Sequence, residues 1–139
     1  MTKRDRELVL AGVDGAVATI TLNRPERHNS LVPDLLRQLG DAISDCDSDP
    51  GARVLVLRAT GRSFSTGGDL AGFREHADAV AQYADELVGL LNDVIVRLYD
   101  CRLPVIAVVD GQVTGGSLGL VLAADIVLVT DRASFTPYY

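Results

Sequence analysis

Short apolar runs separated by polar turns dominate the chain and predict β-strands. The runs 8–11 and 17–22 flank Asp14-Gly15, and two such runs around Asp-Gly are typical of a β-hairpin. Three further runs are short, continuous and rich in β-branched residues, which predicts strands buried inside a sheet. They cover residues 54–57, 105–109 and 126–129.

Apolar residues at helical spacing predict two longer helices between these strands. Pro33 suits a first helical turn, and the apolar positions after it recur along one face: Leu35, Leu36, Leu39, Ala42 and Ile43. Asp49-Pro50-Gly51 ends this helix. A second helical region lies roughly between Ala77 and Tyr99, with Val80, Leu87, Leu91, Val94 and Leu98 on one face. No linker or internal domain boundary interrupts the chain.

Two glycine loops carry the candidate chemistry. Residues 63–70 contain Gly67-Gly68, and residues 111–125 contain Gly115-Gly116, each after an apolar strand. A short helix is expected to start near Gly116, because apolar residues follow it at helical spacing. Backbone N–H groups from two such loops can converge on a carbonyl oxygen and form an oxyanion hole. The alternative is that the glycines only allow tight turns and close packing.

The composition is that of a globular protein and argues against several functions. Of the 139 residues 47% are apolar and 23% charged, which allows one domain with a real core. The net charge of −6 argues against a nucleic-acid surface, although a few local arginines can bind one polyanionic small molecule. The most apolar stretch, residues 113–129, contains Asp125 and is shorter than the roughly 20 residues of a membrane span.

The cysteines and the first residues predict a cytoplasmic protein. Cys46 and Cys101 are too few and too far apart for a disulfide framework, so we expect reduced thiols. Five of the first seven residues are charged and contain no apolar core between them, so no signal peptide is expected.

Several segments resemble the crotonase family, also called the enoyl-CoA hydratase/isomerase superfamily. Phe64-Ser65-Thr66-Gly67-Gly68-Asp69-Leu70 is similar to the first oxyanion-loop motif of that family, and residues 111–125 resemble the second. Residues 23–31 resemble the coenzyme A loop, and Ala133-Ser134-Phe135 resembles the element that follows the second motif. The match spans nearly the whole chain in the family's order and spacing, so it is specific.

The resemblance implies an α/β fold, namely a truncated crotonase-like spiral of β-β-α units. Residues 1–139 would form the N-terminal part of a single domain, because family members are nearly twice this length. Such a unit would expose apolar surface, which implies a partner chain or poor stability. The substrate would be an acyl-CoA thioester, with no metal and no separate cofactor. The family further implies a homo-oligomer, either a trimer or a dimer of trimers.

The resemblance also assigns roles to individual residues. The backbone N–H groups of Gly68 and Gly116 would be the catalytic oxyanion donors. The adenine and pantetheine path would be lined by Ser65, Thr66 and Leu70. The coenzyme A phosphates would lie near Arg24, Arg27 and His28. A merely solvated role is the alternative for Arg24 and Arg27, and is the favoured one for His28.

Two acids of the family's hydratases are missing. The hydratases have a Glu where this chain has Gly119, and a second Glu where an ungapped match places Tyr139. The ending Phe135 to Tyr139 looks more like isomerase members, some of which use an Asp a little further along. We therefore expect an isomerase rather than a hydratase, with its base beyond Tyr139. The alternative is a catalytically silent acyl-CoA-binding or assembly subunit.

Two other acids are expected to be structural. Asp69 follows the first glycine loop, where an Asp suits the N-cap of the next helix. Asp125 lies between a predicted helix and a strand.

Overall fold

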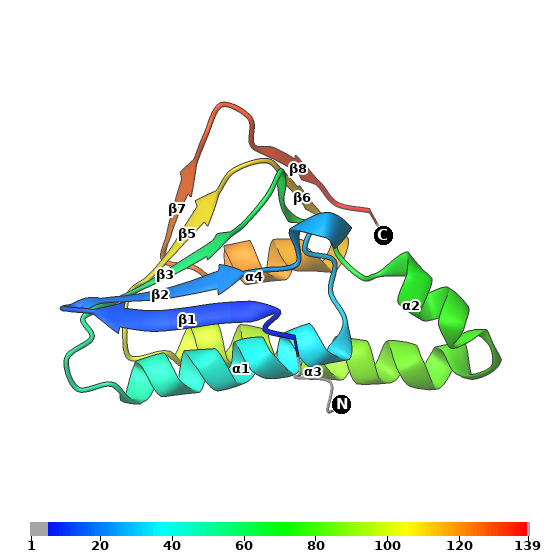
Figure 1. The fold of residues 1–139 in the computed structure, drawn as a ribbon, viewed down its shortest axis with the longest axis horizontal. Coiled ribbons are helices and arrows are strands. Elements are labelled where there is room, and N and C mark those ends of the chain that lie inside the picture. Colours follow the sequence, from blue (N-terminus) through cyan, green and yellow to red (C-terminus); the bar gives the residue numbers. More distant parts are fainter. Residues whose placement is uncertain (1–5, 139) are drawn as a thin grey trace.

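A five-stranded sheet forms one side of the molecule (Figure 1). The computed structural model describes residues 6–138. The strand order is β1-β2-β3-β5-β7, in which β1 and β2 form an antiparallel hairpin and the other neighbours are parallel. The hairpin confirms the prediction around Asp14-Gly15. The strands are β1 Val9–Asp14, β2 Val17–Leu22, β3 Val54–Ala59, β5 Val105–Val109 and β7 Ile126–Val129.

Three short strands form a second sheet, in which all neighbours are parallel. Its order is β4-β6-β8, and each strand comes directly after one strand of the larger sheet. A strand of each sheet and then a helix therefore repeat along the chain, which confirms the spiral of β-β-α units. The short strands are β4 Ser63–Ser65, β6 Gln112–Thr114 and β8 Ser134–Thr136.

The helices follow the predicted pattern with two differences. The region near Ala77 begins as a 3-10 turn, Ala77–Ala79, before the long helix α3. The helix expected near Gly116 also begins as a 3-10 turn, Gly115–Ser117, because the chain tightens there before α4. The α-helices are α1 Pro33–Ser48, α2 Leu70–Glu75, α3 Val80–Asp100 and α4 Leu118–Leu122, and a further 3-10 turn spans Pro25–Arg27.

The core lies between the larger sheet and the helices α1 and α3, which pack side by side (Figure 1). Alternate residues of β2 and β3 point into it, so Ile20 and Leu57 have no exposed surface. The predicted apolar face of α1 is buried throughout. On α3 the predicted face is buried at Leu87, Val94 and Leu98, whereas Val80 at its first turn is 47% exposed.

Apolar surface is concentrated at the edge strand β7. All four of its side chains are exposed, although the sequence predicts a buried strand there. Leu122, at the end of α4, is 80% exposed. The apolar surface expected from the resemblance is therefore present. None of the helices within residues 6–138 has the length and apolar character that crossing a bilayer requires.

Candidate active site

The two glycine loops touch each other. Gly67 has a φ of +81°, and a Cβ added there would lie 2.8 Å from the Thr114 carbonyl oxygen and 3.5 Å from the Gly116 nitrogen. Only glycine combines that backbone conformation with such a close approach. A hydroxyl also joins the loops, since Ser117 Oγ lies 2.6 Å from the Thr114 oxygen and 3.1 Å from the Ser65 oxygen. The two glycine loops are therefore in direct contact, and the oxyanion hole stays a prediction.

An apolar cavity of about 500 Å³ opens beside this contact. Gly68 and Gly116 both line it, together with Thr66 and Leu70, so four predicted site residues share one cavity. The remaining wall is largely apolar, which weakens competition from water for any polar contact made inside. It is formed by Leu31, Gly67, Phe73, Leu87, Val88, Leu91, Thr114, Gly115 and Tyr138.

The backbone N–H groups of Gly68 and Gly116 are available as donors. Gly116 is the second residue of a 3-10 turn, where an N–H has no acceptor within the helix. Gly68 lies between two residues that pair with Leu31, but its own N–H has no acceptor among residues 6–138. Two donors in an apolar cavity can stabilise negative charge on a carbonyl oxygen.

Residues 28–31 pair with the first glycine loop and support it. Leu31 N donates to the Gly67 oxygen at 2.7 Å, and Asp69 N donates to the Leu31 oxygen at 3.0 Å. Asn29 is fully buried, and its Nδ2 donates to the carbonyl oxygens of Thr60 and Ser63. Sequence reasoning gave Asn29 no role. Its place in a polar, turn-forming segment predicts a loop. It does not predict the hydrogen bonds to Thr60 and Ser63, which lie more than 30 residues further along the chain.

The Ser65 hydroxyl bonds to the backbone around the first glycine loop. Its side chain is fully buried and does not line the cavity. The hydroxyl donates to the Asn29 oxygen at 2.8 Å and accepts from Gly67 N at 3.3 Å. These two bonds hold the loop in shape, and the place of Ser65 along the substrate path stays a prediction.

Arg24 is not a solvated residue. Its side chain is 15% exposed, and Nη1 lies 2.6 Å from Asp69 Oδ2. Asp69 also caps α2, because its Oδ1 accepts from Ala71 N at 2.8 Å, as predicted. Burial raises the pKa of Asp69, but hydrogen bonds from Arg24 and the Ala71 N–H outweigh it and leave the pKa below its ordinary value. The ion pair thus favours the folded state above that ordinary pKa and loses this effect as the pH falls through the lowered value.

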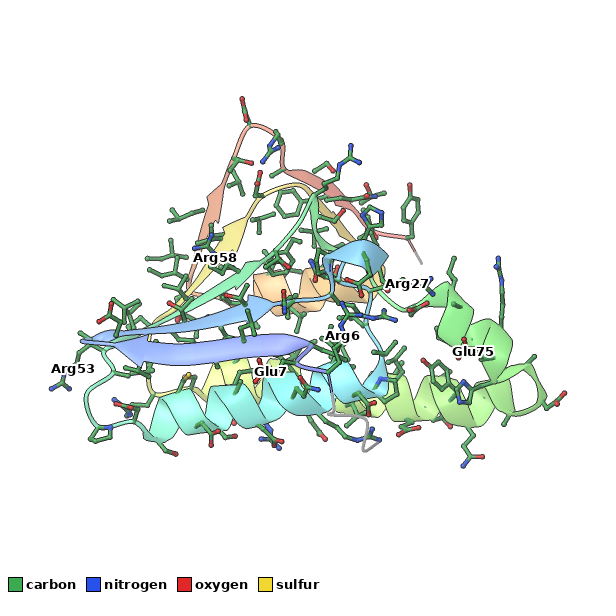
Figure 2. The ribbon with its side chains drawn as sticks, in the orientation of Figure 1. Arg6, Glu7, Arg27, Arg53, Arg58 and Glu75 are labelled. Atoms are coloured by element: carbon green, nitrogen blue, oxygen red, sulfur yellow. The ribbon has the colours of Figure 1, made fainter. Side chains whose placement is uncertain are left out.

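Arg27 lines a second, polar cavity of about 360 Å³ beside α2. Figure 2 shows the Arg27 side chain between the loop after β2 and α2, the helix that carries Glu75. The Arg27 side chain is 49% exposed and its guanidinium is 3.7 Å from Asp69, so it is only loosely held. His28 is exposed, with a left-handed φ of 52° and its Nδ1 3.1 Å from Ser63 Oγ.

Gly119 stands where the family's hydratases have their first acid, and the Ile95 side chain lies against it. A Cβ added to Gly119 would lie 2.6 Å from Ile95 Cδ1, the far end of an α3 side chain, so Ile95 would have to turn aside to admit a side chain at position 119. Tyr139, which matches the second acid, lies outside the described residues. Asp125 is structural as predicted, since its Oδ2 accepts from Val105 N at 2.7 Å.

The fold and the paired glycine loops define a protein of the crotonase type. The sequence profile of the family described as enoyl-CoA hydratase/isomerase matches residues 12–138. The chain belongs to this family.

Named relatives come from several bacteria. The chain is 43% identical over 123 residues to "probable enoyl-CoA hydratase EchA12" of Mycobacterium tuberculosis (strain H37Rv), covering 86% of this chain and 43% of that protein. It is 33% identical over 132 residues to the trans-2-decenoyl-(acyl-carrier-protein) isomerase of Streptococcus mutans, covering 94% and 50%. The crystal structure of an enoyl-CoA hydratase/isomerase from Xanthobacter autotrophicus Py2 has a TM-score of 0.87 at 33% identity, covering 94% of this chain and 48% of that one. The chain thus spans about half the length of the relatives it matches.

Proposed function

We propose that this chain is the N-terminal part of a single domain. The full-length protein would isomerise 3-enoyl-CoA to 2-enoyl-CoA thioesters. The carrying observation is the apolar cavity lined by both Gly68 and Gly116. Removing a proton next to a thioester carbonyl places negative charge on the carbonyl oxygen. Two backbone N–H groups would hold that charge. Thr66 and Leu70 would line the path of the coenzyme A part of the substrate.

The isomerase preference rests on Gly119. Adding water to a 2-enoyl thioester needs one group to activate the water and another to deliver a proton. Gly119 supplies neither, and Ile95 fills the adjacent space. Isomerisation needs one base, which removes a proton and returns it two carbons away. We place this base beyond Tyr139.

A silent acyl-CoA-binding subunit is the second candidate, favoured by the same absence of an acid at position 119. Spectroscopic assays of the full-length protein with a 3-enoyl-CoA and a 2-enoyl-CoA separate the two. Turnover of the 3-enoyl substrate supports the isomerase. Turnover of neither, together with coenzyme A binding in a calorimeter, supports the silent subunit.

The proposal includes a homo-oligomer, either a trimer or a dimer of trimers, in the cytoplasm. The exposed apolar side chains of β7 support association, because monomers rarely leave such a surface uncovered. Analytical ultracentrifugation of the full-length protein tests the assembly.

Arg27→Ala is expected to weaken coenzyme A binding by up to about tenfold and to reduce its salt dependence. A half-exposed arginine gives a charge-assisted contact to phosphate that solvent partly screens. Arg53→Ala is the matched control, because Arg53 lies at the opposite end of the molecule (Figure 2). Calorimetry at two salt concentrations measures both variants, and an unchanged affinity of Arg27→Ala removes Arg27 from the site.

Gly119→Glu is expected to give no efficient hydratase. The new side chain meets Ile95, which costs about 1–3 kcal/mol of overpacking, and none of the described residues that line the apolar cavity is a second acid. Gly119→Glu combined with Ile95→Ala removes the steric conflict and serves as the control. Efficient hydration of 2-enoyl-CoA by the single variant would contradict the isomerase preference.

A further inference from the structure

One nitrogen of the Arg24 guanidinium makes three contacts inside the protein. Its Nη1 lies 2.6 Å from Asp69 Oδ2, 2.8 Å from Ser30 Oγ and 3.1 Å from the Ser30 carbonyl oxygen. Ser30 Oγ also donates to the Asp69 carboxylate at 3.2 Å. Three residues from two loops therefore form one largely buried polar cluster.

This cluster lies directly beside the peptide that presents Gly68. The Gly67 carbonyl and the Gly68 N–H belong to one planar trans peptide, so they point in opposite directions. The Gly67 oxygen accepts from Leu31 N at 2.7 Å, which turns the Gly68 N–H away from Leu31. The next peptide is fixed as well, because Asp69 N donates to the Leu31 oxygen.

We propose that Arg24 is a positioning residue, whose ion pair with Asp69 locks residues 30–31 against residues 67–69 and thereby aims the Gly68 N–H. Leu31 supplies the backbone partners on one side of the ladder. Arg24, through Ser30 and Asp69, supplies the side-chain link that keeps the two strands of that ladder together. The catalytic part of this inference rests on the proposed function.

A positioning role and a phosphate-binding role for Arg24 predict different effects on kcat and on the Kd of coenzyme A. A phosphate ligand contributes to binding, so its loss raises KM or the Kd of coenzyme A. A residue that aims an oxyanion donor contributes mainly in the transition state, so its loss lowers kcat. Misplacing a donor by about 1 Å can cost on the order of 100-fold in rate.

The test compares Arg24→Met with Arg24→Lys, Asp69→Asn and Arg27→Ala in the full-length enzyme. Arg24→Met is expected to lower kcat by about 10–100-fold while the Kd of coenzyme A stays within about twofold. Arg24→Lys keeps the charge and should recover part of the rate. Arg27→Ala should show the opposite split, with the Kd of coenzyme A raised by a larger factor than kcat is lowered. A raised Kd with an unchanged kcat in Arg24→Met would overturn the proposal.

Hydrogen exchange measured by mass spectrometry gives a readout that does not need turnover. Peptides covering residues 29–33 and 66–71 should exchange faster in Arg24→Met and in Asp69→Asn, because the Leu31 and Asp69 amides lose support. If the wild-type enzyme turns over neither enoyl substrate, the proposed function fails and exchange alone decides the role of Arg24. Unchanged exchange in a folded variant overturns it. If circular dichroism shows that Arg24→Met does not fold, Arg24→Lys takes its place in both measurements.

Discussion

Gly116→Pro is expected to lower turnover of the full-length enzyme by about 10²–10³-fold, the loss typical of removing one oxyanion donor. Proline has no N–H, and Gly116 lies in the first turn of a helix, where a proline ring is tolerated. The change therefore removes the donor at a position where the helix itself does not need it. Initial rates with a 3-enoyl-CoA, with folding checked by circular dichroism, measure the effect.

Gly116→Ala is the matched control for this prediction. It keeps the N–H and adds a methyl group that meets Leu91 Cδ2 at 3.0 Å, the far end of a flexible side chain. Its loss of turnover should therefore be much smaller than that of the proline variant. If a folded Gly116→Pro enzyme matched Gly116→Ala, the N–H of Gly116 would have no catalytic role.

Three strands of the larger sheet could be predicted because residues 54–57, 105–109 and 126–129 are apolar throughout. Runs such as Val105–Val109 are buried by neighbours on both sides, and only a strand fits their length. The strand β4 could not be predicted in this way. Its two serines are buried as well, but their hydroxyls make hydrogen bonds instead of packing against apolar side chains, Ser63 with the His28 ring and Ser65 with the Asn29 carbonyl oxygen. A sequence pattern based on hydrophobicity interprets such a segment as a loop.

The glycine positions of the site could be predicted, whereas the supporting residues could not. Gly68 and Gly116 belong to motifs whose residues are consecutive in the sequence, so the motifs can be identified without the fold. Arg24 and Asp69 are 45 residues apart, and only the fold shows that they form an ion pair. A charged residue in a polar loop looks the same in a sequence whether it faces solvent or a buried carboxylate.

Gly111, where the second glycine motif begins, is another position whose importance shows only in the fold. The chain turns there between β5 and β6, and Gly111 has a φ of +91°. A Cβ at this position would lie 2.0 Å from the Arg62 carbonyl oxygen, which belongs to the turn before β4. Backbone atoms cannot rotate away as a side chain can. The two crossing connections would have to separate, and with them the short strands that carry both glycine loops.

Gly111→Ala is therefore expected to lower the free energy of unfolding by about 2–5 kcal/mol, combining the left-handed backbone cost with overpacking. Gly12→Ala is the control, because nothing lies within 4 Å of its added Cβ and its backbone has no left-handed φ. In a strand that substitution should be neutral or stabilise by up to about 1 kcal/mol. Urea denaturation followed by circular dichroism compares the two variants with the wild-type protein. Equal midpoints for Gly111→Ala and wild type would mean that the connections at Arg62 and Gly111 are not held in contact.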